Sequence, residues 1–562
     1  MSLTAKKDSP QPGRSSRGAQ PGPASASPAS ASPAGAGRPS QPGLVALVGT
    51  GPGNPELLTV RAAGLLGRAD LVLGPPELTG PLGHLVPADA ELHDVADLDG
   101  EPRLLIKAAQ AGKLAVALYS GDPLLFGPAA AQAAACAKAR VRFEIVPGLP
   151  AATAVPAYAG IPLTAETSGD VRIIDAADIG GISGDQPLPR SLVILGAEAG
   201  PADLAKTLLA AGWPDGMPFT ITWNGTTTEQ LTVGGKLGSL TADLKSAGVN
   251  LLTETGPAVA VVGETAAGHA ELSWFETKPL FGWRVLVPRT KEQAGSVSQR
   301  LRAYGAVPEE VPTIAVEPPR TPQQMERAVK GLVTGRYQWV AFTSVNAVRA
   351  VREKLEEYGL DARAFAGVKV AAVGDQTARA LLDFGIKPDL VPEAEQSGEG
   401  LAAAWQPYDS ALDPINRVLL PRADIATEAL VARLTELGWE AEDVTAYRTV
   451  RAAPPPAPIR EAIKGGGFDA VLFTSSSTVR NLIGIAGKPH AVTVIAVIGP
   501  QTAQTAAEFG LRVDVRAPKP SATALVDALA EHAAGMRDAS ITAGEPVRKP
   551  SERRRGARRR LR

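Results

Sequence analysis

Short apolar runs alternate with helix-forming patterns between residues 44 and 535, and this alternation constrains the fold more than any other feature. Each run is about one strand long, and in the stretches between the runs apolar residues recur at helical spacing. Strands that alternate with helices are typical of α/β proteins with largely parallel sheets. The expected strands are Leu114–Leu118, Arg142–Val146, Leu192–Leu195, Arg284–Val287, Trp339–Phe342, Val368–Val373, Arg417–Leu420, Ala470–Phe473 and Val492–Ile498.

The composition narrows the class of protein. The 562 residues suffice for about three or four domains, and a net charge of −1 does not favour a molecule built to bind nucleic acid. The one cysteine, Cys136, allows no intramolecular disulfide, and the five scattered histidines lack ligand spacing, so we expect no metal site. No apolar run reaches the length of a bilayer span and the N-terminus lacks an apolar signal core, which indicates a cytoplasmic protein without membrane contact.

Both ends differ in composition from the middle of the chain. Residues 1–43 are rich in Pro, Ala, Ser and Gly and cannot bury enough apolar surface to offset ordering entropy, so we expect them to be disordered. We expect a second disordered tail at residues 536–562, where Arg548–Arg562 is an arginine cluster. The cluster could contact nucleic acid or an anionic surface, but no aromatic residues interleave for stacking, which favours a solvated tail.

A glycine-rich loop follows the apolar run Leu44–Val48. The loop, Val48–Thr59, reads V-G-T-G-P-G-N-P-E-L-L-T and precedes the apolar-periodic segment Arg61–Leu73, which predicts a strand, a tight loop and a helix. Its glycines can adopt positive φ, and Asn54 and Pro55 suit the N-cap and the first helical position. Such a helix start favours polar or anionic ligand groups.

The loop only partly matches a dinucleotide-binding fingerprint. The third small position of that fingerprint is occupied by Asn54, and Asp70 comes before the next strand instead of at its end. A glycine loop alone therefore does not decide which ligand is bound.

The second half of the chain contains an internal repeat. Tyr337–Val348 reads Y-Q-W-V-A-F-T-S-V-N-A-V, and Phe468–Val479 reads F-D-A-V-L-F-T-S-S-S-T-V. Val373–Ala378 (V-G-D-Q-T-A) follows the first copy, and Ile498–Ala503 (I-G-P-Q-T-A) follows the second. Each copy is a strand that ends in a Thr/Ser cluster and a second strand that ends in glycine, which predicts two similar α/β lobes rather than a solenoid.

Hydroxyl groups at the ends of these strands suggest a ligand site. Ligands of open α/β sheets bind beyond the carboxyl ends of the strands, so two facing lobes would line a cleft with hydroxyls and helix N-termini. Such a cleft suits a ligand with several carboxylates. The alternative is that the side chains only cap helices, but their duplication favours a function. The residues concerned are Thr343, Ser344, Thr474 and Ser475.

Further motifs of the first half form an ordered set with the glycine loop. They are Tyr119–Pro128 (Y-S-G-D-P-L-L-F-G-P), Phe143–Thr164 (F-E-I-V-P-G-L-P-A-A-T-A-V-P-A-Y-A-G-I-P-L-T), Trp223–Thr226 (W-N-G-T) and Gly256–Glu264 (G-P-A-V-A-V-V-G-E). Together they resemble the tetrapyrrole methylase family over residues 44–266, and most closely its uroporphyrinogen-III C-methyltransferases.

This resemblance implies a two-lobed α/β domain that binds S-adenosylmethionine between its lobes and methylates uroporphyrinogen III to precorrin-2. It also implies that Gly121, Asp122 and Pro123 hold the amino acid end of the methyl donor, with Thr226 and Ala258 near its adenosine. Because the family is commonly dimeric, a homodimer through this domain is allowed. The glycine-loop residues of the implied site are Gly49, Gly51, Pro52 and Gly53.

The chain departs from the family's pattern at several positions, some of which carry cations in the family. Pro128 stands in place of an arginine, Pro150–Ala151 in place of a Thr-Ser pair, and Ala165–Glu166 in place of a His-Arg pair. A substrate with several carboxylates needs cationic partners. Two interpretations stay open: an active methyltransferase, or a non-catalytic methylase domain that acts as a scaffold or binding module beside a working second half.

The second half resembles uroporphyrinogen-III synthase over residues 283–535. The motifs are Val285–Arg289 (V-L-V-P-R), Phe342–Val348, Val373–Ala378, Val418–Arg422 (V-L-L-P-R), Val444–Thr449 (V-T-A-Y-R-T), Phe473–Ser477 and Gly499–Ala503. The family fold is two α/β lobes joined by two strands, which places residues 283–316 with 450–535 in one lobe and 317–446 in the other. Residues 267–282 would be the linker between the two halves.

The implied reaction takes hydroxymethylbilane, removes water, inverts ring D and closes the macrocycle. Tyr447 is the candidate to assist departure of the hydroxyl, although it could instead be a tyrosine of the hinge between lobes. Arg289 and Arg422 could supply charge to the site or only pair with acidic neighbours. The expected substrate-binding hydroxyls are Ser344, Thr377, Ser475 and Thr502. The product of the synthase is the substrate of the methylase. A fusion of the two would therefore suit an enzyme that supplies the sirohaem or cobalamin branch of tetrapyrrole biosynthesis.

Overall fold

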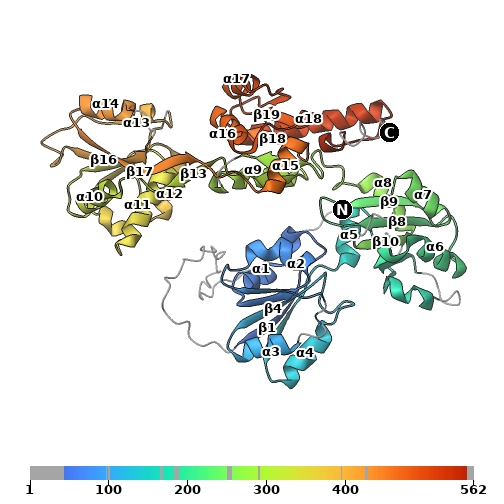
Figure 1. The fold of residues 1–562 in the computed structure, drawn as a ribbon. Helices are drawn as coiled ribbons and strands as arrows, with labels where there is room; N and C mark the ends of the chain where they lie inside the picture. Colours follow the sequence, from blue (N-terminus) through green and yellow to red (C-terminus); the bar gives the residue numbers. More distant parts are fainter. Residues whose placement is uncertain are drawn as a thin grey trace, which may run out of the picture. The chain divides into compact units, whose positions relative to one another are not determined.

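The computed structural model describes residues 43–96, 98, 102–164, 169–182, 189–249, 256–288, 291–393, 395–424 and 428–553 (Figure 1). The described strands form four five-stranded sheets with helices packed against them, which confirms the α/β class. The chain divides into two compact units. The first contains the described chain up to Val48, Val60–Tyr119 and Gly127–Pro147, and the second contains Gly49–Thr59, Ser120–Phe126 and Gly148–Arg562.

The first unit is built on a parallel sheet in the order β3-β2-β4-β1-β5. Its strands are β1 (Leu44–Gly49), β2 (Leu71–Gly74), β3 (Glu91–Asp94), β4 (Leu114–Tyr119) and β5 (Arg142–Val146). Its helices are α1 (Val60–Leu66), α2 (Pro76–Leu82), α3 (Pro102–Gln110) and α4 (Ala129–Lys138).

The predicted single helix over Arg61–Leu73 is wrong. Helix α1 ends at Leu66, and β2 begins at Leu71. Between them, the main chain of Asp70 donates to Leu114 O at 2.9 Å and its carboxylate accepts from Leu114 N at 2.7 Å, so pairing with β4 begins there. Asn54 is an N-cap as predicted, but of the short 3-10 helix Pro55–Leu57.

The second sheet, in the order β6-β7-β10-β8-β9, is mostly antiparallel and is the exception among sheets that are otherwise largely parallel, as expected. Strands β8 and β9 are joined by a connection too short for a parallel crossover. The strands are β6 (Val171–Asp175), β7 (Ser191–Leu195), β8 (Pro218–Trp223), β9 (Leu231–Lys236) and β10 (Ala258–Gly263). The helices are α5 (Ala151–Ala159), α6 (Pro201–Ala210), α7 (Leu240–Ser246) and α8 (His269–Leu272).

The third sheet is parallel, in the order β12-β11-β18-β19-β20. Its strands are β11 (Arg284–Val287), β12 (Val307–Glu310), β18 (Ala470–Phe473), β19 (Val494–Val497) and β20 (Val515–Arg516). Its helices are α9 (Lys291–Ala303), α15 (Ala457–Gly465), α16 (Ser476–Ala486), α17 (Pro500–Glu508) and α18 (Ala522–Thr542).

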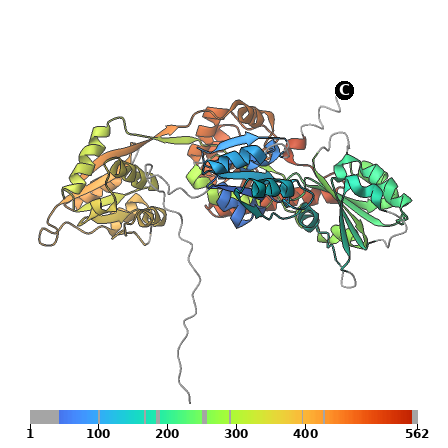
Figure 2. The same ribbon diagram turned by 90° about the horizontal axis from the view of Figure 1, so that it is seen from below.

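The fourth sheet has the order β13-β17-β16-β14-β15, with β13 antiparallel to β17. Helices α10, α11 and α12 pack on one face and α13 and α14 on the other (Figure 1, Figure 2). The strands are β13 (Ile314–Glu317), β14 (Trp339–Phe342), β15 (Lys369–Ala372), β16 (Arg417–Ala423) and β17 (Glu440–Arg451). The helices are α10 (Pro322–Val333), α11 (Val345–Glu357), α12 (Asp375–Asp383), α13 (Gly398–Ala404) and α14 (Ala429–Glu436).

The expected lobe boundaries fall inside two strands of this fourth sheet. The division between residues 316 and 317 cuts β13, and the start of the returning segment at residue 450 cuts β17. The two strands pair with each other from Ile314 with Arg451 to Glu317 with Arg448. Both strands therefore belong to the lobe of the fourth sheet over their full lengths.

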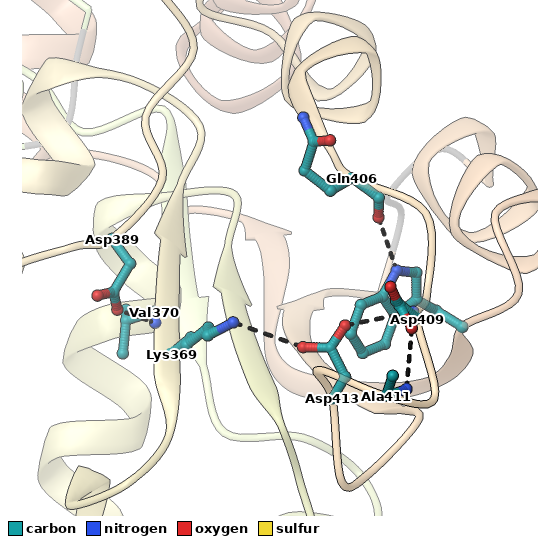
Figure 3. Close-up of polar contacts among 8 residues, drawn as sticks. Lys369, Val370, Asp389, Gln406, Asp409, Ala411 and Asp413 are labelled. Carbon is teal, nitrogen blue, oxygen red and sulfur yellow. Dashed lines mark hydrogen bonds and ion pairs between the residues drawn. The ribbon is translucent and has the colours of Figure 1, made fainter.

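Aspartates placed just before or between strands hold the starts of neighbouring strands. Asp389 Oδ2 accepts from Val370 N at 2.7 Å (Figure 3), and Asp514 Oδ2 accepts from Ile495 N at 2.9 Å, at matching places of the internal repeat. Figure 3 also shows the loop before β16, where the Asp413 carboxylate lies 3.5 Å from the Lys369 ammonium and accepts from Asp409 N at 3.4 Å. These contacts fix the amino end of the fourth sheet.

The expected C-terminal tail is ordered over its described part. Helix α18 continues to Thr542, past the boundary expected at residue 535, and its apolar residues as far as Met536 pack into the core of the third sheet. Beyond the helix, Ser551 N donates to the buried carboxylate of Asp469 at 2.9 Å. Residues 554–562 and residues 1–42 lie outside the described residues, so the two tail predictions remain predictions there.

Candidate functional site

Two loops of the predicted methyl-donor site are joined backbone to backbone. Gly51 N donates to Gly121 O at 3.2 Å, and Gly121 N donates to Gly51 O at 2.8 Å. Gly51 has φ of +77° and Gly121 has φ of +63°, a region that side chains disfavour. The glycines that the sequence singled out are therefore needed for the shape of these loops.

A third glycine completes this contact. A Cβ on Gly148 would lie 2.0 Å from Gly121 O, and a Cβ on Gly49 would lie 2.5 Å from Gly148 N. The Asp122 carboxylate accepts from Gly148 N at 3.3 Å and from Leu124 N at 2.9 Å, so it orients two loops through their main chains. Gly148 was not among the predicted site residues, although it lies in the V-P-G motif that could have identified it.

The W-N-G-T turn meets the glycine loop at Thr226. The side chain of Thr226 is buried, and its Oγ1 accepts from Asn54 N at 3.3 Å. Its own N–H donates to Gln230 Oε1 at 2.7 Å. Thr226 has φ of +70° and Asn224 has φ of +48°, which costs on the order of 1–3 kcal/mol each and is typical of functional turns.

The last predicted member of this site lies at the start of β10. Ala258 is buried, pairs with Trp223 across β8 and β10, and donates its N–H to Glu198 Oε2 at 2.7 Å. The structure thus connects the glycine loop, the Gly121 loop and the W-N-G-T turn through described hydrogen bonds. Pro52 and Pro123 lie in the same loops, half-buried and buried respectively.

These residues fit S-adenosylmethionine in the chemistry of their donors. The loops carry no side chains at three positive-φ glycines, Gly51, Gly53 and Gly121, of which Gly51 and Gly121 bond each other through their main chains. A compact polar ligand can approach such loops closely.

The prolines that replace an arginine and a Thr-Ser pair of the family pattern stand at the starts of two helices. Pro128 precedes the first residue of α4 and Pro150 precedes the first residue of α5, and neither position has a side-chain cap. Ala165 and Glu166 lie outside the described residues.

In the second half, Ser344 and Tyr447 lie together. Ser344 caps α11, where its Oγ accepts from Ala347 N at 3.1 Å, and the same Oγ is 3.0 Å from Tyr447 Oη. Tyr447 lies in β17 and is 7% exposed. The chain separation of 103 residues makes this a tertiary contact.

The two copies of the repeat place their hydroxyls alike. Ser475 caps α16 as Ser344 caps α11, and its Oγ accepts from Thr478 N at 3.2 Å. Thr377 and Thr502 are both buried in the first turns of α12 and α17. Each hydroxyl follows one of the parallel strands of its sheet at the carboxyl end, where ligands of open α/β sheets bind.

Arg422 forms an ion pair with an acidic neighbour. The buried Arg422 guanidinium grips the Asp443 carboxylate with two nitrogens, and Nε donates to Oδ1 at 2.6 Å. This hydrogen bond raises the pKa of Arg422, so the arginine is held charged and in place. Of the two alternatives for Arg422, the structure favours pairing, while Arg289 lies outside the described residues.

A cavity of about 290 Å³ opens beside Tyr447. Its wall combines Asn346 and Arg349 of α11 with Glu317 and Pro318 at the end of β13. Asn346 and Arg349 are one helical turn apart, so both can face the same ligand.

In the described ranges, no group of three or more histidine, cysteine, aspartate or glutamate side chains could hold a metal ion. Among the helices of the same ranges, none combines the length and apolar character that a bilayer-spanning segment needs.

Comparison with protein families finds one match in each half of the chain. The sequence model of the Tetrapyrrole (Corrin/Porphyrin) Methylases matches residues 44–241, and that of Uroporphyrinogen-III synthase HemD matches residues 295–527. The fold and the two family matches therefore define an enzyme of tetrapyrrole biosynthesis with a C-methyltransferase domain and a synthase domain.

One relative extends over almost the whole chain. The porphyrin biosynthesis protein HemD of Ruminiclostridium josui is 31% identical over 509 residues, which cover 88% of this chain and 99% of the relative. The chain belongs to this HemD family, in which a tetrapyrrole methylase is fused to a uroporphyrinogen-III synthase.

Other similar proteins cover one half only. Siroheme synthase 1 of Klebsiella pneumoniae is 35% identical over 251 residues, and the match spans 42% of this chain and 51% of that protein. The uroporphyrin-III C-methyltransferase of Thermus thermophilus, solved with S-adenyl homocysteine, is 26% identical with a TM-score of 0.34 and covers 40% of this chain and 99% of that chain.

Proposed function

We propose that the synthase domain converts hydroxymethylbilane into uroporphyrinogen III with inversion of ring D, and that the methylase domain then methylates this product to precorrin-2. The single observation that carries the first step is the hydrogen bond between Ser344 and Tyr447, where Tyr447 lines a cavity between α10, α11 and β13. A buried tyrosine hydroxyl at that place suits a proton donor to a substrate oxygen.

The proposed first step is an elimination of water. Tyr447 Oη gives its proton to the terminal hydroxyl of the substrate, the carbon–oxygen bond breaks with its electron pair going to oxygen, and water leaves. The pyrrole nitrogen stabilises the resulting cation, and ring closure at the inverted ring later releases a proton that restores the tyrosine. Since the cationic intermediate is reactive, the main tasks of the site are to hold the linear substrate in a folded geometry and to exclude water.

Recognition of the substrate falls to the four strand–helix turns. The first turns of α11, α12, α16 and α17 present main-chain N–H groups and the positive end of each helix dipole. Ser344, Thr377, Ser475 and Thr502 add a hydroxyl to each turn. Acetate and propionate groups of the substrate are the ligands that this donor set favours.

The methylase domain would use S-adenosylmethionine as co-substrate, which supplies an electrophilic methyl group on sulfonium. Gly121, Asp122 and Pro123 would hold its amino acid end, and Thr226 and Ala258 would lie near its adenosine. The residues of this chain contribute position: Asp122 fixes two loops, and Thr226 joins the turn to the glycine loop. Transfer between two held reactants chiefly needs such positioning.

One observation favours the alternative of a non-catalytic methylase domain. Pro128 and Pro150 stand just before α4 and α5, where the resemblance leads us to expect an arginine and a Thr-Ser pair, so two expected partners of substrate carboxylates are absent at these positions. In that case the domain would bind the synthase product or support the synthase without methylating.

One experiment separates these functions. The full chain is incubated with hydroxymethylbilane, with and without S-adenosylmethionine, and the isomers and methylated products are resolved by chromatography. We expect the type III isomer without the donor and precorrin-2 or its oxidised form with it. Type III product in both tubes without methylation would leave only the alternative, and type I isomer alone would reject the synthase function.

A further inference from the structure

The hydroxyl of Ser344 takes part in two hydrogen bonds that have different requirements. A serine hydroxyl has one proton and two acceptor lone pairs. Ala347 N donates to one lone pair at 3.1 Å, as in any serine N-cap. The contact with Tyr447 Oη at 3.0 Å then uses either the serine proton or the second lone pair.

The two directions of the second bond have opposite consequences for Tyr447. If the tyrosine donates to Ser344, its proton points into α11 and is not available to a substrate. If Ser344 donates to Tyr447 Oη, the tyrosine proton is free to point toward the cavity. Because Ser344 already accepts from Ala347 N, its own O–H is polarised into a better donor, and the chain of hydrogen bonds gains cooperativity.

We propose that Ser344 is a positioning residue that donates to Tyr447 Oη and so directs the tyrosine proton toward the leaving hydroxyl of the substrate. This inference rests on the proposed synthase function. It replaces the carboxylate-binding role proposed above for the Ser344 hydroxyl, because the single proton of that hydroxyl cannot serve both partners.

The other copy of the repeat shows that capping alone does not require a tyrosine. Ser475 caps α16 at the matching position, and its hydroxyl contacts Thr478 N at 3.2 Å and Ser477 Oγ at 2.8 Å. The pairing of cap and tyrosine therefore belongs to one copy. The main chain and the ring of Tyr447 are also fixed in place. Its carbonyl accepts from Asp424 N at 3.2 Å, and its ring packs in the core of the lobe.

The test is a double-mutant cycle on the full chain, with steady-state synthase kinetics and the isomer ratio as readouts. We expect Ser344→Ala to lower kcat about tenfold while KM changes little, and Ser344→Thr, which keeps the hydroxyl, to restore most of the rate. In a Tyr447→Phe background, Ser344→Ala should lower kcat no further, because the tyrosine proton that Ser344 directs is already absent.

Two further variants separate positioning from helix capping. Ser344→Asp keeps a good N-cap but has no proton to donate, so we expect it to be slow although folded. Ser521→Ala removes the cap of α18, where Ser521 accepts from Ala524 N at 3.2 Å, and should leave kcat unchanged.

The outcomes that overturn the inference differ from those that overturn the synthase function. A raised KM with unchanged kcat in Ser344→Ala, or an equal loss in the Tyr447→Phe background, would assign Ser344 to substrate binding. Normal kcat in Ser344→Asp would also reject the inference. A wild-type chain that yields only type I isomer would instead reject the proposed function itself.

Discussion

At the scale of single residues, the contact of Gly49, Gly121 and Gly148 leaves no space for a methyl group. We expect Gly148→Ala to abolish donor-dependent methylation, because its Cβ would lie 2.0 Å from Gly121 O and the loops would have to separate. Type III isomer formation should persist, since the synthase domain is untouched. Gly64→Ala in α1, where a Cβ meets nothing within 4 Å, is the matched control, and methylation equal to that of this control would contradict the prediction.

Loss of the Tyr447 hydroxyl has a separate expected result. Tyr447→Phe should lower kcat for the type III isomer by about 100-fold, because general acid assistance is removed while the ring still fills its place. Product analysis should then show mainly the type I isomer, which forms without the enzyme.

Tyr337 provides the control for this change. Its buried hydroxyl makes no hydrogen bond of good geometry among the described residues, and burial, together with the nearby Glu442 carboxylate, raises its pKa to about 12. Tyr337→Phe should leave synthase activity intact and not lower stability, since an unpaired buried hydroxyl costs about 1–3 kcal/mol. An equal loss of activity in both variants would point to packing instead of proton donation.

Single residues also show how far sequence reasoning reaches. The hydroxyls at Ser344, Thr377, Ser475 and Thr502 were predictable, because the internal repeat marks them at the ends of apolar strands. Their roles stay predictions. The pairing of Arg422 with Asp443 was not predictable, because the two residues are distant in sequence and meet only when β16 and β17 align in register.

At the scale of elements, an ion pair joins α18 to α9. Arg300 Nε donates to Asp527 Oδ1 at 2.6 Å and Tyr304 Oη donates to the same oxygen at 3.0 Å, and the bond from Arg300 holds the pKa of Asp527 below its usual range. Because the folded pKa lies below the unfolded value of about 3.9, this stabilisation is present above that value and is lost as the pH falls through the folded pKa.

We expect Asp527→Asn to lower the free energy of unfolding at pH 7 by less than about 1 kcal/mol, since both side chains are partly exposed. The difference from wild type should shrink as the pH falls below about 4, where the aspartate also becomes neutral. Urea unfolding at a series of pH values measures this. Asp538→Asn, at an exposed position of the same helix, should show no such narrowing, and a difference that is constant with pH would refute the electrostatic cause.

The strands were predicted better than their directions. Buried apolar runs such as Trp339–Phe342 and Ala470–Phe473 are strands with the predicted bounds, because such runs have few alternatives in an α/β chain. The antiparallel second sheet was missed, since strand direction depends on connection length and on partners far along the chain. The ordered segment after residue 535 was missed because its anchor, Asp469, lies far away in sequence.

At the scale of the whole molecule, the expected linker at residues 267–282 is packed at both ends. Trp274 Nε1 donates to Ala157 O of α5 at 3.0 Å, and its ring lies 5.1 Å from that of Tyr158. Leu280 is buried in the core of the third sheet, and its N–H donates to Tyr304 O at 3.1 Å. The segment is therefore structured by side chains from both domains.

We expect Trp274→Ala to speed proteolytic cleavage within residues 267–282, because the ring contacts and the hydrogen bond to α5 are lost together. Each domain should keep its own activity, since no residue of either proposed site is changed. Cleavage sites are read by mass spectrometry after limited proteolysis. Trp274→Phe keeps a ring and should stay close to wild type, whereas unchanged cleavage in Trp274→Ala would mean that other contacts hold the segment.

The buried Asp469 carboxylate sets an order of events during synthesis of the chain. It accepts from Arg284 N in β11 and from Ser551 N, so it joins an early strand, a late strand and a segment later still. At about 5–20 residues per second, a ribosome leaves β11 without its partner β18 for roughly 10–40 s. The methylase domain and the lobe of the fourth sheet have time to fold first. The lobe of the third sheet folds last, because β11 cannot pair with β18 until β18 has been synthesised.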